Sequence, residues 1–489
     1  MLVLASWLLL GSCFRVTLPE AASDSGAQSA VQSDSGSEDS AQSTDSADDD
    51  GRPVVFISDG ANHRFLYVEP KTERIIASID LAERHPDICA GESTCIGFGG
   101  QPSVDAETGE DRALVVVAPE DHSTTAEAQS ARVEMIRFGT DGPTRDWMLE
   151  DLDFSTHFGD NSELCAAEAA CEAPRDGTWM QWRKCSLVHT HDVEVVSEDD
   201  DEVLMWIADT SAPARVMLVS LDKSSTCGTV LAALGSGTVA DWPEYQDVND
   251  VDLVEINGAD AILVSSLSEG GEEGHGRISV WNGWNDEWSE VWHHPVNEGA
   301  NLASPHNPDL FVASDGQTYL VYAHTNGAGM HIDYDDWTGE RDHQGSIGVL
   351  RLHDGGFDYL ADIVVSADRG DGQAGFGAIR DVDVLDDGSF LVTDSGCLNH
   401  RFTDCERSGA VWNVEYDVTQ LVADGVTGQF SPDHLEQVFV EAVVRDVWWD
   451  SPLECGLLTP YESDLIVSSE AGMAIQEALE QTEGSCDQP

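Results

Sequence analysis

Residues 304–327 read SPHNPDLFVASDGQTYLVYAHTNG. His306 stands just ahead of an apolar run at 310–312, a Ser-Asp-Gly sequence at 314–316 follows as a turn, and a second apolar run begins at Tyr319. Short apolar runs separated by turn residues are typical of paired β-strands. The stretch therefore predicts a β-hairpin that is headed by a histidine.

The same layout recurs along the chain with another polar residue in the place of the histidine. Each copy has a polar head, a short strand pattern, an acidic or glycine turn, a more apolar strand and often a third strand, without a helical period. Clear copies occupy 189–221, 249–282, 304–353 and 380–417, and weaker ones occupy 54–81 and 101–138. Units of three or four strands, recurring at roughly 55 to 75 residues, predict an all-β chain made of blade-like sheets.

A ring of such sheets is the architecture that the repeat favours, namely a six-bladed β-propeller, with seven blades as the alternative. The first copy is incomplete, and the end of the chain carries another head, Arg445-Asp446, followed by strand-like residues. We expect the N- and C-terminal strands to pair and close the ring, because closure removes two exposed sheet edges. The propeller is predicted to occupy 51–489 as a single domain with disulfide-stapled loops.

The polar heads are expected to converge in space. In a propeller the innermost strands all run in the same direction along the axis, so their first residues meet at one mouth of the central channel. The heads are His189 and His191, Asn249 and Asp250, His306 and Asn307, Arg380 and Asp381, and Arg445 and Asp446. A polar site at the mouth is therefore predicted, which gives the histidine at 306 a reason.

A structural role competes with a functional one at some of these positions. The aspartates at 192, 250, 381 and 446 could simply accept hydrogen bonds from backbone N–H groups at the strand starts. No such need calls for an imidazole or a guanidinium. His191, His306 and Arg380 are therefore the stronger candidates for a functional site.

The charge of the chain restricts its partners. Of 489 residues, 92 are acidic and 23 are basic, and the net charge is −69. So large a negative charge repels polyanions and excludes nucleic acid as a partner. Salt screens the repulsion between like charges, so a halophilic source is expected. Refolding or activity that peaks below about 0.1 M salt would contradict that interpretation.

The N-terminus indicates export. MLVLASWLLLGSC is short and apolar, and its last four residues resemble a bacterial lipobox that ends at Cys13, the cysteine to be lipidated. An ordinary secretion signal is the alternative. We expect a signal and lipobox at 1–13 and a disordered acidic Ser/Asp/Ala tether at 14–50. The protein is then a monomer that is lipid-anchored in the periplasm, at the outer membrane or at the cell surface, and meets the membrane only through its lipid anchor.

The cysteines agree with an exported protein. The chain has 11, and ten remain if Cys13 is lipidated. An even number of cysteines outside the cytoplasm favours disulfides, and the close pairs Cys89/Cys95 and Cys397/Cys405 are predicted to staple loops. A zinc site is the rival interpretation, but no CxxC pair occurs.

Four phrases carry a resemblance to a known family: HDVEVV at 191–196, NDVDLVEINGADAILVSS at 249–266, PHNPDLF at 305–311 and IRDVDVLDDGSFLVTDS at 379–395. Through them the chain resembles the arylsulfotransferase family, and the likeness extends over roughly residues 54 to 470. The resemblance implies a six-bladed propeller that moves a sulfuryl group between phenolic compounds through a sulfated histidine, without a cofactor.

The resemblance also assigns roles to individual residues. It places His306 at the nucleophile and His191 at a supporting histidine, and Arg380 joins them as the third catalytic candidate. His189, Asn249, Asn307 and Arg445 are the expected substrate-binding residues. A departure from the family lies at 247–251 and 265–267, where the expected histidine and arginine are missing. Since sulfuryl transfer needs cationic groups around the sulfate oxygens, Arg380 or Arg445 would have to substitute.

Two other functions stay open on the sequence. Carboxylates and amide oxygens suit a hard cation, so a calcium-centred propeller is one alternative, either lactonase-like or structural. Its candidate ligands are Asn249, Asp250, Asn307 and Asp381. The other alternative is a noncatalytic surface module that binds a ligand or a partner at its mouth.

Overall fold

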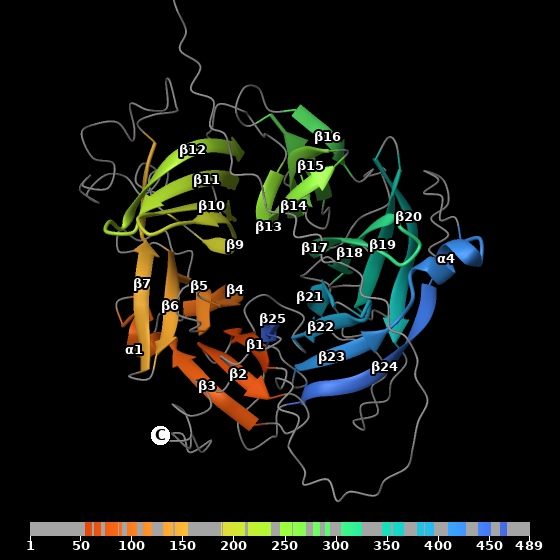
Figure 1. Ribbon diagram of the computed structural model, residues 1–489, viewed down its shortest axis with the longest axis horizontal. Coiled ribbons are helices and arrows are strands. Elements are labelled where there is room, and N and C mark those ends of the chain that lie inside the picture. The colour runs from red at the N-terminus through yellow and green to blue at the C-terminus, as the bar shows by residue number, and fades with distance from the viewer. Residues whose placement is uncertain are drawn as a thin grey trace, which may run out of the picture. The chain divides into compact units, whose positions relative to one another are not determined.

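In the computed structural model, the described residues between 54 and 466 form mostly β-strands, with the short helices α1 (Leu81–Arg84) and α4 (Thr419–Ala423) (Figure 1). The structure describes residues 54–60, 63–69, 74–86, 88–89, 95–104, 111–119, 131–139, 142–154, 187, 189–210, 214–235, 245–256, 258–269, 277–283, 289–293, 305–324, 345–353, 356–365, 379–385, 387–395, 409–426, 439–450 and 460–466. Cys13, the tether at 14–50 and the pair Cys397/Cys405 lie outside these residues.

Six blades surround a common centre, two of them joined edge to edge in one eight-stranded sheet, so the protein is an all-β, six-bladed β-propeller, as the repeat predicted (Figure 1). Written from the innermost to the outermost strand, the blades are as follows. Blade 1 is β25 (Pro460–Ile466), β1 (Val54–Asp59), β2 (Arg64–Glu69) and β3 (Arg74–Asp80); blade 2 is β4 (Cys95–Val104), β5 (Asp111–Pro119), β6 (Arg132–Gly139) and β7 (Gly142–Leu149); blade 3 is β9 (Thr190–Glu198), β10 (Glu202–Asp209), β11 (Arg215–Asp222) and β12 (Cys227–Gly235).

The second half of the ring has the same construction. Blade 4 is β13 (Tyr245–Ile256), β14 (Ala259–Glu269), β15 (Arg277–Asn282) and β16 (Ser289–His293); blade 5 is β17 (Pro305–Val312), β18 (Thr318–His324), β19 (Ser346–His353) and β20 (Gly356–Val365); blade 6 is β21 (Ile379–Val384), β22 (Phe390–Asp394), β23 (Ala410–Glu415) and β24 (Phe439–Asp450). A short β8 (Asp151–Asp153) pairs in parallel with β12, and β20 pairs in parallel with β24.

Apolar side chains fill the space between neighbouring blades. In β18, every residue from Tyr319 to His324 is buried, because a blade is covered on both faces by the blades beside it. One cluster joins blades 5 and 6 through Tyr319, Phe390 and Trp412. Another joins blades 1 and 6, where Ile57 packs with Leu391. The core is thus divided into the interfaces between blades.

The innermost strands lie next to one another around the centre. β4 contacts β9, β9 contacts β13, β13 contacts β17, β17 contacts β21, and β25 contacts both β21 and β4. β25 also pairs with β1, with Val54 opposite Ile466. Strands from the two ends of the described chain therefore share one sheet. That this pairing is what holds the ring closed stays a prediction.

Arg445 and Asp446 do not head an innermost strand, and that prediction is wrong. Both lie within β24, the outermost strand of blade 6, where Asp446 pairs with Asn413 of β23. The innermost strand of blade 1 is instead β25. The backbone of Arg445 therefore lies in an outermost strand, whereas the heads of blades 3 to 6 lie on or beside innermost ones.

The connection between blades 1 and 2 carries its own supports. Helix α1 (Leu81–Arg84) follows β3, and Cys89 and Cys95 form a disulfide, as predicted. Cys227 is disulfide-bonded as well. In the described part of the chain, helices are too short or too polar to cross a membrane.

Candidate functional site

Four blades bring their polar heads to the starts of neighbouring innermost strands. His191 lies on β9, Asn249 on β13, His306 on β17 and Arg380 on β21, and the side chains of all four are buried. Contacts between blades join them in two pairs, Asn249 with His191 and Arg380 with His306. The sequence prediction that these heads converge is thus met by pairs of neighbouring blades, and the polar site at a channel mouth stays a prediction.

His306 and Arg380 form the first pair. Nη1 of Arg380 lies 3.3 Å from Nε2 of His306. A guanidinium can only donate hydrogen bonds, so Nε2 must be the unprotonated nitrogen and must carry the lone pair that faces the guanidinium. His306 is only 1% exposed, so a substrate can reach this lone pair only when side chains at the mouth move. The pair thus places a nitrogen with a lone pair beside a permanent positive charge.

His191 is held by an amide and an aromatic ring. Nδ2 of Asn249 donates to Nδ1 of His191 over 2.7 Å, which places the ring proton of the neutral imidazole on Nε2. The ring of Phe98, from β4, stacks on His191 with centroids 4.1 Å apart and planes at 17°. His189 lies edge-on to Phe98 at 4.9 Å. Both imidazoles are thus oriented by blade 2, whose contribution the sequence did not indicate.

Asn307 and Asp381 form a third contact between blades. Nδ2 of Asn307 donates to Oδ1 of Asp381 over 3.2 Å. The φ angle of Asn307 is 37°, in the left-handed region that asparagine tolerates better than most residues. β17 has a bulge between His306 and Asp309, and the turned backbone at Asn307 belongs to it. The bulge aims consecutive polar side chains at the next blade.

Asp192 has the structural role that competed with function, and Asp309, which that prediction did not include, has the same one. Oδ2 of Asp192 accepts the N–H of Val251 over 3.1 Å, and Oδ2 of Asp309 accepts the N–H of Val384 over 3.0 Å. Each carboxylate thereby ties one innermost strand to the next. The interpretation of Asp192 as a partner for backbone N–H groups is correct, although its donor lies in the neighbouring blade.

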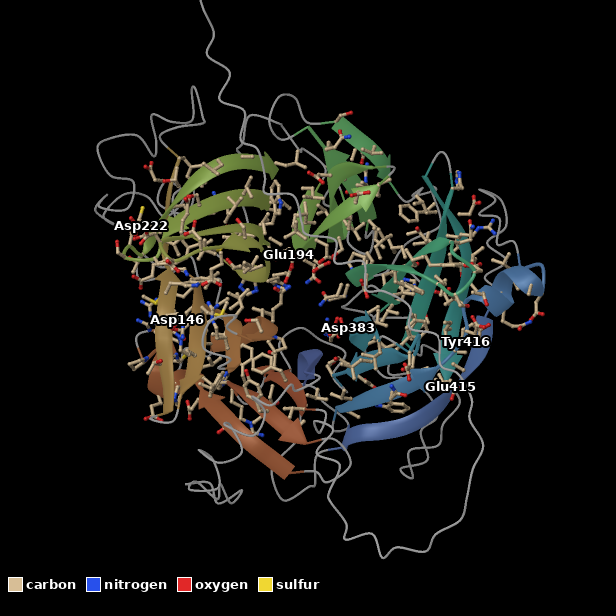
Figure 2. The ribbon with its side chains drawn as sticks, viewed as in Figure 1. Asp146, Glu194, Asp222, Asp383, Glu415 and Tyr416 are labelled. Atoms are coloured by element: carbon tan, nitrogen blue, oxygen red, sulfur yellow. A yellow bond between two sulfur atoms is a disulfide. The ribbon has the colours of Figure 1, made fainter. Side chains whose placement is uncertain are left out.

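The innermost strands also carry a group of acidic side chains near the heads. Burial raises the pKa of Asp192, Glu194 and Asp309, although hydrogen bonds from Val251, Gln101 and Val384 oppose the rise. The pKa of Asp252 is raised well above its usual value, first by burial and then by the negative charges of Asp192, Glu194, Asp309 and Asp381. Figure 2 places Glu194 and Asp383 on the inner side of their blades, toward the centre. These groups hold their protons more tightly than free carboxyls do.

Glu194, Asp252 and Asp309 were missed by the sequence prediction. A signal for two of them was present, because Asp192/Glu194 and Asp250/Asp252 stand two residues apart on predicted strands. Residues at positions i and i+2 of a strand point to the same side. The spacing therefore indicated that Glu194 lies on the same side of its strand as Asp192, and Asp252 on the same side as Asp250.

The calcium alternative gains no support from the arrangement of its ligands. Asn307 and Asp381 bond to each other, and Asn249 bonds to His191. Within the residues that the structure describes, no three His, Cys, Asp or Glu side chains are grouped so that they could hold a metal ion. A calcium site stays a prediction that nothing here tests.

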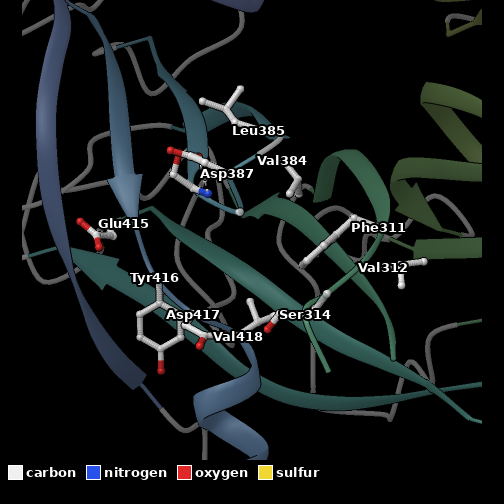
Figure 3. Close-up of a pocket in the computed structure, with 13 residues that line it drawn as sticks. Phe311, Val312, Ser314, Val384, Leu385, Asp387, Glu415, Tyr416, Asp417 and Val418 are labelled. Carbon is white, nitrogen blue, oxygen red and sulfur yellow. Dashed lines mark hydrogen bonds between the residues drawn. The ribbon is translucent and has the colours of Figure 1, made fainter. Parts of the chain in front are cut away.

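A cavity lies at the other end of the innermost strands. It has a volume of about 690 Å³ and is lined by residues of blades 5 and 6, including Phe311, Leu385 and Tyr416 (Figure 3). His306 is near the start of β17 and Val312 is at its end, so about 20 Å of extended strand separates the mouth from the cavity. The cavity and the polar heads are thus two different places.

Comparisons with known proteins assign no family to the chain. No family model matches the chain, and no curated protein matches it. Similar solved structures include a protein from Bacteroides fragilis provisionally identified as a 6-phosphogluconolactonase, at 10% identity and a TM-score of 0.38, covering 86% of this chain and 99% of that one. The α-L-arabinofuranosidase Arb93A from Fusarium graminearum matches at 9% identity and a TM-score of 0.33, covering 67% of this chain and 94% of that one.

Proposed function

We propose that the mouth transfers a sulfuryl group between phenolic compounds, with His306 as the nucleophile. The observation that carries the proposal is the contact of 3.3 Å between Nε2 of His306 and the guanidinium of Arg380. Attack on a sulfate ester needs an unprotonated nitrogen and a positive charge for the nonbridging oxygens. The pair supplies both, and the resemblance of the surrounding phrases to arylsulfotransferases agrees with it.

The reaction would proceed in two displacements. The lone pair of Nε2 attacks sulfur, the bond between sulfur and the aryl oxygen breaks, and the phenolate leaves with the electron pair and takes a proton from water. The oxygen of an acceptor phenol then attacks the sulfur of the sulfated histidine, the N–S bond breaks, and the phenol proton goes to solvent. Arg380 would turn from Nε2 to the sulfate oxygens in the first step.

The carboxyls near the mouth set a condition on this chemistry. A sulfate ester is an anion, and ionised Asp309 and Asp381 would repel it. Because the pKa of Asp309 is raised by burial, its carboxyl is neutral over a wider pH range than a free aspartic acid. Sulfate-ester binding is therefore expected to strengthen as the pH falls and Asp309 takes up its proton.

The test is a burst experiment with 4-nitrophenyl sulfate on the full chain, in the presence and absence of a phenol acceptor and over a range of salt concentrations. One equivalent of nitrophenol per protein is expected before steady turnover, together with a sulfated His306 in the intact-mass spectrum. His306→Ala should abolish both. His353→Ala is the matched control, because His353 is exposed on β19 and pairs with Asp358. No burst from the unchanged protein at any salt concentration would remove the proposal.

A second candidate rests on the raised pKa of Asp252. A carboxyl whose pKa is raised by burial and by neighbouring carboxylates is suited to protonating a leaving group, as in glycoside hydrolysis. Hydrolysis of aryl glycosides that is lost in Asp252→Asn and kept in His306→Ala would favour this candidate. The opposite pattern with aryl sulfates would favour the first.

A further inference from the structure

The cavity in blades 5 and 6 is bounded by three chain reversals at the end of the propeller away from the histidines. These are the turn after β17 at 313–317, the turn after β21 at 385–389, and the passage from β23 into α4 (Thr419–Ala423). Figure 3 shows side chains from all three surrounding the same space. Ligands of moderate size fit cavities of a few hundred Å³, so about 690 Å³ is sufficient.

Apolar and aromatic side chains form much of this wall. Phe311 and Tyr416 are half-buried, and Leu385 and Val418 lie beside them. Val312 is 69% exposed, and only one other large apolar side chain in the described chain, Val291, is comparably exposed. Exposed apolar groups in a hollow indicate that a partner with apolar groups covers them.

The polar part of the wall is anionic. Asp387, Glu415 and Asp417 line the cavity, and none of the described lining residues is Lys, Arg or His. Oδ1 of Asp417 accepts hydrogen bonds from the N–H and the hydroxyl of Thr419, over 3.0 and 2.6 Å. Its Oδ2 and both carboxylate oxygens of Glu415 have no protein donor within the described residues.

Asp387 is held in position by a chain of hydrogen bonds that starts in the core. Nδ2 of the buried Asn413 donates to the hydroxyl of Ser389 over 3.0 Å, and that hydroxyl donates to Oδ1 of Asp387 over 2.5 Å. The N–H of Ser389 donates to the same oxygen over 3.0 Å. A carboxylate that is held by the core keeps its charge in one position. Such preorganisation suits the binding of a ligand, whereas a carboxylate that serves only solubility needs no fixed position.

We propose that this cavity binds an organic cation that carries alkyl groups, such as a quaternary ammonium compound. A positive charge with little hydration is attracted to aromatic rings and to carboxylates, and its alkyl groups would cover Val312 and Leu385. Phe311 already stacks on Tyr319 with ring centroids 5.8 Å apart, so Tyr416 is expected to make the larger ring contribution. An anion would meet three like charges. The strongly negative chain also draws cations toward the protein from a distance. This binding does not depend on the chemistry proposed for the mouth.

The experiment compares choline with 3,3-dimethylbutan-1-ol, a neutral molecule of nearly the same shape, by isothermal titration calorimetry on the full chain. Choline is expected to bind saturably at one site, at least about tenfold more tightly than the alcohol. Only the cation is attracted electrostatically to the aromatic rings and the carboxylates. Tyr416→Ala should weaken choline about tenfold, and Glu415→Gln about threefold.

Glu255→Gln is the matched control. Glu255 is exposed on β13 in blade 4, so it contributes to the same overall charge without facing the cavity. Its replacement should leave choline binding unchanged. If Tyr416→Ala fails to fold, Glu415→Gln alone decides, since its side chain is exposed. Equal affinity for choline and the alcohol, or no saturable binding of choline, would overturn the proposal. Equal losses of choline affinity in Glu415→Gln and Glu255→Gln would overturn it too, because the binding would then reflect only the net negative charge of the protein.

Discussion

Glu134 offers the sharpest test of the electrostatic reasoning. Its side chain is 0% exposed in β6 of blade 2. Nε2 of His85 lies 2.9 Å from Oε1, Nε of Arg145 lies 2.7 Å from Oε2, and Arg84 donates to Oε1 as well. His85 and Arg84 belong to the connection from blade 1, so one buried carboxylate fastens that connection to blade 2.

The magnitude follows from the pKa. Burial alone would raise the pKa of Glu134, but hydrogen bonds and charges from His85 and Arg84 outweigh it and lower the pKa from 4.5 to about 2. Each pKa unit corresponds to about 1.4 kcal/mol, so the ionised carboxylate contributes about 3 kcal/mol to folding. Because the folded pKa is depressed, this contribution is complete above about pH 4.5 and is lost as the pH falls toward about 2.

Glu134→Gln is therefore expected to lower the free energy of unfolding by about 3 kcal/mol at pH 7, and the difference from the unchanged protein should shrink below about pH 4. Urea unfolding followed by tryptophan fluorescence at several pH values measures both. Glu150→Gln is the control, because Glu150 pairs with Arg132 at 2.7 Å in a partly exposed setting and should cost less than about 1 kcal/mol. A loss under about 1 kcal/mol for Glu134→Gln, or one that is independent of pH, would refute the reasoning.

Three further predictions concern the rest of the fold. Burial and neighbouring carboxylates raise the pKa of Asp252, so its ionisation weakens the folded state increasingly above about pH 4; urea unfolding should find Asp252→Asn more stable than the unchanged protein at about pH 8, with the difference vanishing near pH 4. A Cβ on Gly348 would lie 2.1 Å from the ring of Tyr322, so Gly348→Ala should lower stability by about 1–3 kcal/mol, and an unchanged melting temperature would contradict that packing. The disulfide between Cys89 and Cys95 closes a short loop, so Cys89→Ser should lose about 2 kcal/mol in chemical denaturation, and equal stability with and without reductant would contradict it.

Most of the blade pattern could be predicted from the sequence, because polar heads, turns and apolar strands are local features. The outermost strand β24 was mistaken for an innermost one, since its Val-Val-Arg-Asp-Val sequence has the same character as a true head. Which strand is innermost in the blade shared between the chain ends depends on pairing over some 400 residues, as between Val54 and Ile466. Local pattern carries no information on that pairing.

The candidate site could be predicted only in part, for a similar reason. His191, His306, Asn307 and Arg380 stand at recurring heads and were found there. Phe98 lies in β4 just ahead of the weak copy at 101–138, where no head marks it, and it faces His191 only because blades 2 and 3 are neighbours. The raised pKa of Asp252 likewise depends on carboxylates from three other blades. Such collective effects of the ring do not appear in any single repeat.

The parallel pairing of β20 with β24 bears on how the ring yields to an entering molecule. It matches Asp362 with Phe439 through Val365 with Ala442, so main-chain hydrogen bonds fasten blades 5 and 6 at their outer rims. His306 and Arg380 stand on the inner strands of these same two blades. Widening of the propeller is therefore expected to begin between two neighbouring blades whose edges are not joined by main-chain hydrogen bonds. The strands that carry His306 and Arg380 would then move together. The amide hydrogens of β20 should be among the last to exchange with solvent.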